Sequence, residues 1–361
     1  MIKIGVFFGL ACIAMVGGWA LLPRDGKAQP ASFSAAGPEL LDMHCHVAGI
    51  GAGGSGAFIS EQLRHSWKYR IYLKSFGISE DELRQHGDGL VIRRLSEQLA
   101  ESQLVGAAVV LALDGVVDEQ GNLDRARTES YVPNDFVARE TAKYANLYFG
   151  ASVNPYRPDA LERLEQARAD GAVLIKWLPA IQQIDPADER LIPFYEKLVE
   201  LDLPLLTHAG DEHSFTRADN SLGDPLKLRL PLDLGVTVIA AHVATSGQQD
   251  GQDNMARLLP LFEEYPNLYA DVSSLTQLNK VRFMRRLQDS GVAAERLLYG
   301  TDFPLIRTGL TSPLFSLPQL GWQRTLPLLK VRSAWDQDVR LKLAYGLPAE
   351  VFSNAAALLL K

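Results

Sequence analysis

The sequence predicts an α/β fold, a single (β/α)8 TIM barrel that follows an apolar N-terminal leader. Three observations support this fold class. Eight short apolar runs alternate with helical stretches, no internal repeat divides them, and metal-binding side chains stand where several runs end. A chain of 361 residues, 47% of them hydrophobic, is long enough for one barrel plus extensions.

The expected strands are short and almost continuously apolar. Runs of this kind are typical of parallel strands that are buried on both faces. Eight of them alternating with helices favour closure into a barrel, and an open, doubly wound sheet is the alternative. The runs span residues 40–47, 105–113, 147–153, 171–178, 203–208, 236–242, 268–272 and 297–302.

Helical stretches lie between most of these runs. Residues 158–170 begin with proline and acidic residues and stop at Gly171, which are start and stop signals of a helix. Residues 187–201 and 254–265 follow the same pattern.

Two connections are long, residues 48–103 and residues 114–135. The first begins with a glycine-rich piece that lacks the Gly-Lys-Ser/Thr ending of a phosphate-binding loop. Both connections are expected over the C-terminal face of the barrel, where substrates bind, and the first is expected to be a lid or an inert loop.

The N-terminal residues are assigned separately from the barrel domain, residues 39–361. Residues 1–22 contain an almost unbroken apolar run, from 4 to 22, and are expected to be a signal peptide or a membrane anchor. Residues 23–38 are rich in Pro, Gly, Ala and Ser, which predicts a flexible tether. Either interpretation of the leader predicts an exported protein, periplasmic or extracytoplasmic, that contacts a membrane only through this segment.

Charge and cysteine content exclude some classes of partner and scaffold. A net charge of -7 provides no broad basic surface for phosphates, so no nucleic-acid partner is expected. Two cysteines cannot form a disulfide framework.

Metal-ligating side chains occur at the C-terminal ends of several expected strands. In His44-Cys45-His46, residues i and i+2 point to the same side of a strand, so both imidazoles are expected to face the barrel axis. Asp302 ends the eighth strand, which lies beside the first in a closed barrel, and His208 ends the fifth. Three imidazoles and one carboxylate suit a divalent transition metal, with zinc as the default.

Two further side chains have several possible roles at such a site. His242 ends the sixth expected strand and could ligate a second metal, hold a substrate oxygen or contact the reacting water. Lys176 lies in the fourth expected strand, and a buried lysine loses its charge readily. Its neutral amine could form a carbamate that bridges two metals. The alternatives are binding of a substrate anion and a structural salt bridge.

In their order and spacing, these motifs resemble the amidohydrolase superfamily and, within it, the amidohydrolase-related (amidohydrolase 2) family. The resemblance covers about residues 40–357 and includes Leu-Asp-Met-His-Cys-His, Ile-Lys-Trp-Leu-Pro, Thr-His-Ala-Gly, Ala-Ala-His-Val and Tyr-Gly-Thr-Asp-Phe-Pro. It implies a (β/α)8 barrel, one or two divalent metals and hydrolysis as the commonest chemistry. It matches His44, His46 and Asp302 to ligand positions of strands one and eight. Lys176 stands where binuclear members place a carboxylated lysine.

The expected function is metal-dependent hydrolysis of a small molecule at an amide C–N bond or a lactone or ester C–O bond. Asp302 would accept the proton of the attacking water and pass it to the leaving group, and the metal or His242 would polarise the carbonyl. A non-oxidative decarboxylase is the alternative reaction, and a tethered binding protein is the alternative class. Candidate substrate contacts, chosen because they follow or line strand ends, are Trp177, His213, Arg217, Arg307 and Asn154.

Overall fold

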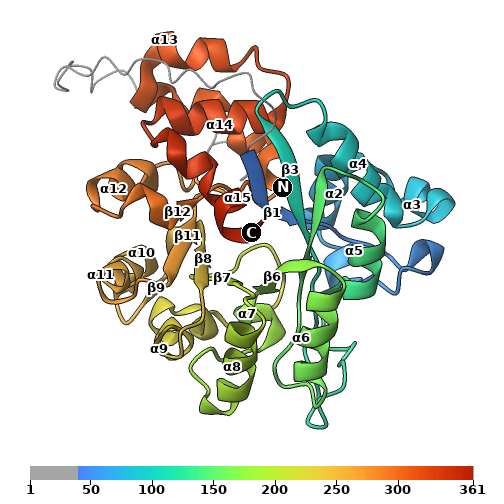
Figure 1. Cartoon of the computed structure of the whole chain (residues 1–361). Helices are drawn as coiled ribbons and strands as arrows, with labels where there is room; N and C mark the ends of the chain where they lie inside the picture. The colour runs from blue at the N-terminus through green and yellow to red at the C-terminus, as the bar shows by residue number, and fades with distance from the viewer. Residues whose placement is uncertain (1–39, 361) are drawn as a thin grey trace, which may run out of the picture. The chain divides into compact units, whose positions relative to one another are not determined.

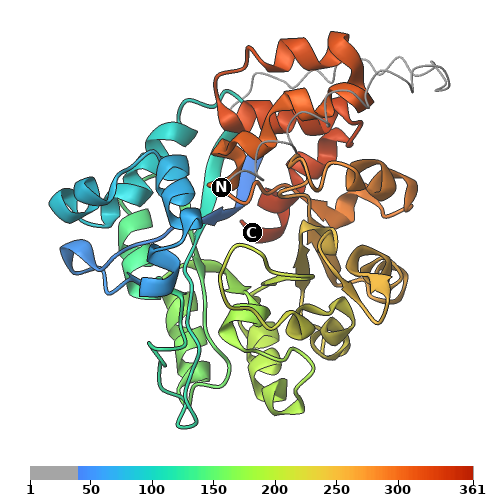
Figure 2. The same cartoon turned by 180° about the vertical axis from the view of Figure 1, so that it is seen from behind.

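The structure, a computed structural model, describes residues 40–360. Its main sheet has eight parallel strands in the order β1-β3-β5-β6-β7-β8-β11-β12. Figures 1 and 2 show the helices arranged around these strands. The predicted (β/α)8 fold class is confirmed, with the eight strands in a nearly closed barrel. The strands are β1 (Leu40–His46), β3 (Val105–Leu111), β5 (Leu147–Ala151), β6 (Ala172–Trp177), β7 (Leu205–His208), β8 (Val238–Ala241), β11 (Leu268–Asp271) and β12 (Leu297–Leu298).

Helices occupy the connections between these strands. Those that precede β7 are α1 (Glu61–Arg64), α2 (Trp67–Phe76), α3 (Glu80–His86), α4 (Gly89–Leu99), α5 (Asn134–Thr141), α6 (Ala160–Ala169), α7 (Pro179–Gln182) and α8 (Ile192–Glu200). Those that follow β7 are α9 (Arg229–Asp233), α10 (Asn254–Leu258), α11 (Leu261–Glu264), α12 (Phe283–Asp289), α13 (Leu317–Leu328), α14 (Ala334–Ala344) and α15 (Asn354–Leu359). Two small antiparallel pairs complete the list, β2 (Phe58–Ile59) with β4 (Ser130–Tyr131) and β9 (Gln248–Gln249) with β10 (Gln252–Asp253).

Element boundaries differ from the sequence prediction in physically simple ways. The stretch 254–265 forms two helices, α10 and α11, because Pro260 between them has no amide hydrogen to continue the first helix. Strand β12 stops at Leu298, well before Asp302. The predicted leader and tether, residues 1–38, lie outside the described residues. Within the part that is described, no helix is long and apolar enough to cross a membrane.

Barrel closure is made by backbone hydrogen bonds between β1 and the segment that follows β12. The amide of Met43 donates to the Tyr299 carbonyl at 3.2 Å, and the amide of His46 donates to the Phe303 carbonyl at 2.8 Å. The amide of Phe303 in turn donates to the His44 carbonyl at 3.2 Å. These bonds place Asp302 next to the β1 histidines, as closure of the barrel predicts.

The barrel interior is apolar toward one end and polar toward the other. Leu41 and Met43 of β1 share a buried cluster with Leu174, Leu206 and other inward residues of the strands. Helix α15 adds buried side chains to the same cluster and lies near β1 in Figure 1. The apolar end is therefore closed by packing, which leaves the opposite end for polar chemistry.

An irregularity in β1 turns its histidines to the inside. Strict alternation after Leu41 and Met43 would point Cys45, not His44, to the interior. The pairing of β1 with β3 shifts register between Asp42 and Cys45, and a bulge of this kind re-aims the side chains that follow it. His44 and His46 consequently lie inside, whereas the Cys45 thiol hydrogen-bonds to Asp42 at 3.0 Å.

Asp42, on the opposite face of β1 from the histidines, also stabilises the closed barrel. Its buried carboxylate accepts hydrogen bonds from the amide of His44 at 3.1 Å, the amide of Thr301 at 2.9 Å and the indole Nε1 of Trp335 at 2.7 Å. One side chain thus joins β1, the segment before Asp302 and α14.

We expect Asp42→Ala to lower the free energy of unfolding by about 3 kcal/mol, because each buried donor left without a partner costs about 1–3 kcal/mol. Chemical denaturation of the purified chain measures the change. Asp289→Ala, at an exposed position of α12, is the matched control and should change stability little. A loss below about 1 kcal/mol for Asp42→Ala would contradict the role assigned to this carboxylate.

Candidate metal centre

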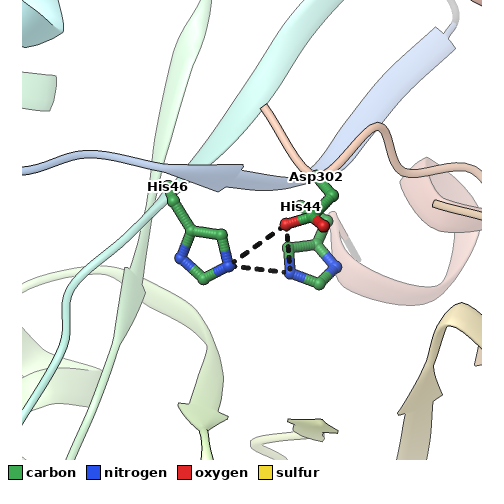
Figure 3. Close-up of side chains that lie close together, drawn as sticks. All are labelled: His44, His46 and Asp302. Atoms are coloured by element: carbon green, nitrogen blue, oxygen red, sulfur yellow. Dashed lines mark hydrogen bonds and ion pairs between the residues drawn. The ribbon is translucent and has the colours of Figure 1, made fainter. Parts of the chain in front are cut away.

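Three of the predicted ligands converge at the polar end of the barrel (Figure 3). His44 Nε2 and His46 Nε2 are 3.1 Å apart. Asp302 Oδ1 lies 3.7 Å from His44 Nε2 and 3.5 Å from His46 Nε2. His44 and Asp302 are buried, and His46 is partly exposed. Asp302 has a left-handed backbone with φ 62°, a conformation that costs a non-glycine residue energy and that clusters at functional sites.

The His44 ring is oriented by a carboxylate that the sequence analysis did not single out. Asp271, the last residue of β11, lies with Oδ2 2.7 Å from His44 Nδ1. A carboxylate in this position favours the tautomer with the proton on Nδ1 and leaves the Nε2 lone pair for a ligand. Burial opposes the ionisation of Asp271, yet His44 and Ser273 hold the pKa of its carboxyl well below its usual range.

His242 stands beside this pair, on the strand end next to β11. Its ring stacks on that of His44 with centroids 5.2 Å apart, and its Nε2 lies 3.8 Å from Asp302 Oδ2. Its Nδ1 lies 2.7 Å from the hydroxyl of Ser273. His44, His242 and Asp271 form a second group whose donor atoms lie within 4.8 Å of one another.

His208 is close to these groups but belongs to neither of them. Its ring packs against that of His242 at a centroid distance of 5.3 Å. Its Nδ1 lies 3.6 Å from Glu212 Oε2, and its Nε2 lies 3.4 Å from the Asp211 carbonyl oxygen. The structure therefore brings three of the four predicted ligands together and leaves His208 at the edge of the site.

The protonation of these residues suits metal binding. Burial lowers the pKa of His46 and of His242 well below the usual histidine value, and it lowers the pKa of His208 as well. Imidazoles with lowered pKa values are neutral at neutral pH, and the neutral ring is the form that ligates a metal.

The donor set fits a divalent ion. Donors that share one ion at about 2.1 Å stand no more than about 4.2 Å apart. The distances among His44, His46 and Asp302, between 3.1 and 3.7 Å, meet this limit. Imidazole nitrogen and carboxylate oxygen together suit zinc and neighbouring transition metals.

Lys176 lies directly against the ligand set. It is fully buried in β6, and its Nζ is 2.9 Å from His44 Nε2. Burial lowers its pKa to about 8, although the carboxylates of Asp271 and Asp302 oppose that shift. The Lys176 amine is thus within reach of any ion held by His44. Carboxylation of Lys176 stays a prediction.

We expect Asp271→Asn to weaken metal binding about 10- to 100-fold, the usual effect of removing a carboxylate that orients a ligating histidine. The amide keeps the size of the side chain but loses the charge that stabilises the Nδ1-protonated ring of His44. Competition with a chromophoric chelator measures the affinity. An unchanged affinity would show that His44 needs no orienting carboxylate.

The pocket beside this centre has apolar walls supplied mainly by the long connection after β1. His46, His208, His242 and Asp302 lie on its polar side. The apolar side includes Leu63, Tyr69, Leu73, Phe76, Ile78 and Leu83. The connection thus lines the pocket, as expected for a segment over this face of the barrel.

Helix α2 is tied to the loop that follows β7. Lys68 Nζ donates to the carbonyl oxygens of His213 and Phe215, both at 2.6 Å. The Tyr72 hydroxyl donates to the carbonyl oxygen of Ser214 at 3.1 Å. Because residues 213–215 also line the pocket, the connections after β1 and β7 close over it as one unit.

Of the candidate substrate contacts, His213 lines the pocket. Trp177 is fully buried, packs against Phe194 at 5.3 Å between ring centroids and donates to the Val153 carbonyl at 2.8 Å. Asn154 is also buried, and its side-chain amide donates to the Gly115 carbonyl at 2.9 Å.

The two candidate arginines also lie outside the residues that line the pocket. Arg217 is on the surface, where its Nε donates to Gln62 Oε1 at 2.9 Å. The Arg307 guanidinium lies near Gly77, at the end of α2.

Comparison with known proteins identifies the family. The amidohydrolase family model Amidohydro_2 matches residues 41–352, which is most of the chain. This chain is an amidohydrolase-family protein. A search of curated protein sequences found no match.

Solved structures similar to this amidohydrolase share its fold at low sequence identity. A protein from Pseudomonas putida, described as a candidate 2-pyrone-4,6-dicarboxylic acid hydrolase, has 15% identity and a TM-score of 0.52, with 89% of this chain and 97% of that chain covered. An uncharacterised TIM-barrel protein from Bordetella bronchiseptica has 16% identity and a TM-score of 0.53, with 85% and 99% covered. Both support the barrel fold.

Proposed function

We propose that this amidohydrolase-family protein is a metal-dependent hydrolase that cleaves an amide C–N bond or a lactone or ester C–O bond. The placement of Asp302 is the observation that carries the proposal. One carboxylate oxygen faces the His44–His46 pair, and the other lies 3.8 Å from His242 Nε2. A carboxylate in this position can hold a cation and handle a proton at the same site.

The residues that would hold the ion are His44, His46 and Asp302, with His208 and Lys176 beside them. When bound, a divalent ion supplies Lewis acidity, which polarises a carbonyl and acidifies water. Asp302 accepts the proton from the attacking water and delivers it to the leaving group. Ser274 donates to Asp302 Oδ2 at 2.6 Å and fixes the carboxylate for this transfer.

His242 presents an unprotonated Nε2 to the site. The Ser273 hydroxyl donates its only proton to Asp271, so it can accept a hydrogen bond from the Nδ1 proton of His242. This network favours the tautomer of His242 in which Nε2 carries a lone pair. His242 then acts on the substrate side as a proton acceptor or as a further ligand.

Turnover in water enriched in heavy oxygen tests the proposal. The metal-loaded chain is incubated with a panel of amides, lactones, esters and aromatic carboxylates. Hydrolysis transfers one heavy oxygen atom to the carboxylic acid product, as the proposal requires. Release of carbon dioxide without oxygen uptake would instead assign decarboxylation. Stoichiometric metal without turnover on the panel would favour a binding protein.

A further inference from the structure

The pocket contains one basic side chain whose charge the structure leaves available. Lys280 follows β11, is partly buried and is the only lysine or arginine among the residues that line the pocket. Among residues 40–360, none forms a hydrogen bond or ion pair with its ammonium group. An ammonium held in a largely apolar pocket gains free energy when an anion joins it.

Hydrogen bonds connect the turn that contains Lys280 to the metal centre. The backbone amide of Lys280 donates to the Gln277 carbonyl at 2.9 Å. Gln277 Nε2 donates to the Ser274 hydroxyl at 2.8 Å, and that hydroxyl donates to Asp302. Two side chains thus link the Lys280 turn to the carboxylate of the ligand set, so the backbone of this turn has a fixed place relative to the metal centre.

Carboxylates near Lys280 already have partners of their own. Glu212 accepts a hydrogen bond from the Ser214 amide and lies 3.6 Å from His208 Nδ1. Asp302 is bound by Ser274 and faces the histidines, and Asp271 is bound by His44. The ammonium is therefore the basic group in this pocket that remains for an anionic ligand.

The apolar wall of the pocket offers no positively charged side chain to a second carboxylate. The wall formed by α1, α2 and the start of α3 is built from aliphatic and aromatic side chains, and Phe215 of the opposite loop extends it. Burying apolar ligand surface against this wall is favourable, whereas burying another carboxylate there without a cation costs free energy. The tie between Lys68 and the loop after β7 holds the wall in place before a ligand enters.

We propose that the site selects amphiphilic substrates with a single carboxylate, bound by Lys280 beside the metal centre, and an uncharged apolar body that packs against residues of α1, α2 and α3. This inference rests on the proposed function, because it names the substrate class of the same site. Lys280 acts here as a specificity-determining residue.

Equilibrium binding of unreactive ligands to the metal-loaded full-length chain tests this inference. The probes are 4-phenylbutanoate, its neutral analogue 4-phenylbutan-1-ol, which has no bond that the proposed reaction could hydrolyse, and glutarate, which has two carboxylates and no apolar body. Titration calorimetry should show that 4-phenylbutanoate binds about 10- to 100-fold more tightly than either other probe. The neutral probe lacks the hydrogen bond to a charged group, and glutarate lacks the apolar surface that the wall buries.

Variants separate the ammonium from other sources of affinity. Lys280→Met should weaken binding of 4-phenylbutanoate about 10-fold or more and leave binding of 4-phenylbutan-1-ol unchanged, and Lys280→Arg should largely restore binding of the acid. Leu73→Asn should weaken both phenyl ligands, because it removes apolar contact from the wall. Lys143→Met, at an exposed position after α5, is the matched control and should bind like the wild type.

Equal binding of the acid and the alcohol would overturn the inference, as would an acid affinity that Lys280→Met leaves intact but metal removal abolishes. The second result would assign the carboxylate to the ion. Because the probes do not react, these outcomes are independent of whether the chain hydrolyses amides or esters. A failed turnover assay together with Lys280-dependent binding would revise the chemistry and keep the ligand class.

Discussion

Replacing Asp302 with asparagine is expected to lower kcat about 10²- to 10⁴-fold, the contribution usual for a positioned general base. The amide has nearly the same shape as the carboxylate, so its oxygen can face the histidines while its Nδ2, in the place of Oδ2, donates to the Ser274 hydroxyl in place of accepting from it. It cannot accept the proton of the attacking water. Steady-state kinetics on whichever substrate shows turnover gives kcat, and elemental analysis shows that much of the metal is retained.

Asp289→Asn is the control for this substitution, since it makes the same chemical change on the exposed face of α12. Its kinetics should match those of the wild type. If Asp302→Asn retained wild-type turnover with its metal in place, the proton would have to pass through another group, and the mechanism built on Asp302 would be wrong.

Replacing His44 with alanine is expected to remove bound metal altogether. His44 belongs to both groups of converging donors, with His46 and Asp302 and with His242 and Asp271, so its loss disrupts either arrangement. Elemental analysis of the purified chain should change from at least one ion per molecule to almost none. His65→Ala is the matched control, because His65 is an exposed histidine outside both groups of converging donors, and its ring bonds to Glu61.

The wild-type metal content in the same experiment decides the role of Lys176. Two ions per chain, reduced to one in Lys176→Met, would support a carbamate that bridges two metals. One ion in both proteins would support an unmodified amine beside a single metal. No ion in the wild type, even after refolding with zinc or manganese, would contradict the metal centre itself.

The barrel and the core of its site could be predicted from sequence because both follow from periodicity and closure. Continuous apolar runs mark strands that are buried on both faces. Once eight of them close into a barrel, Asp302 must lie beside His44 and His46, although more than 250 residues separate them in the chain. The sequence analysis did not identify Asp271 as a site residue, although it is the last residue of β11 and so lies at a strand end, the kind of position that was searched.

Substrate contacts were harder to predict, and strand alternation explains one case. Lys176 points into the barrel, so its neighbour Trp177 must point outward, where it packs against α8. The apolar wall could not be derived, since it depends on how residues 58–83 fold over the barrel. The sequence analysis did not single out Lys280, because the position of its turn depends on hydrogen bonds of Gln277 and Ser274 that no sequence pattern marks.

The contacts that join α2 to the loop after β7 go to backbone carbonyl groups, not to side chains. Any amino acid presents the same carbonyl, so the identities of residues 213–215 are free to vary without loosening this attachment. Substitutions at these positions should therefore be tolerated during evolution. A mutant library randomised at residues 213–215 should bind ligands of new shapes while the fold stays intact. Such substitutions would leave the donor groups of the metal centre unchanged.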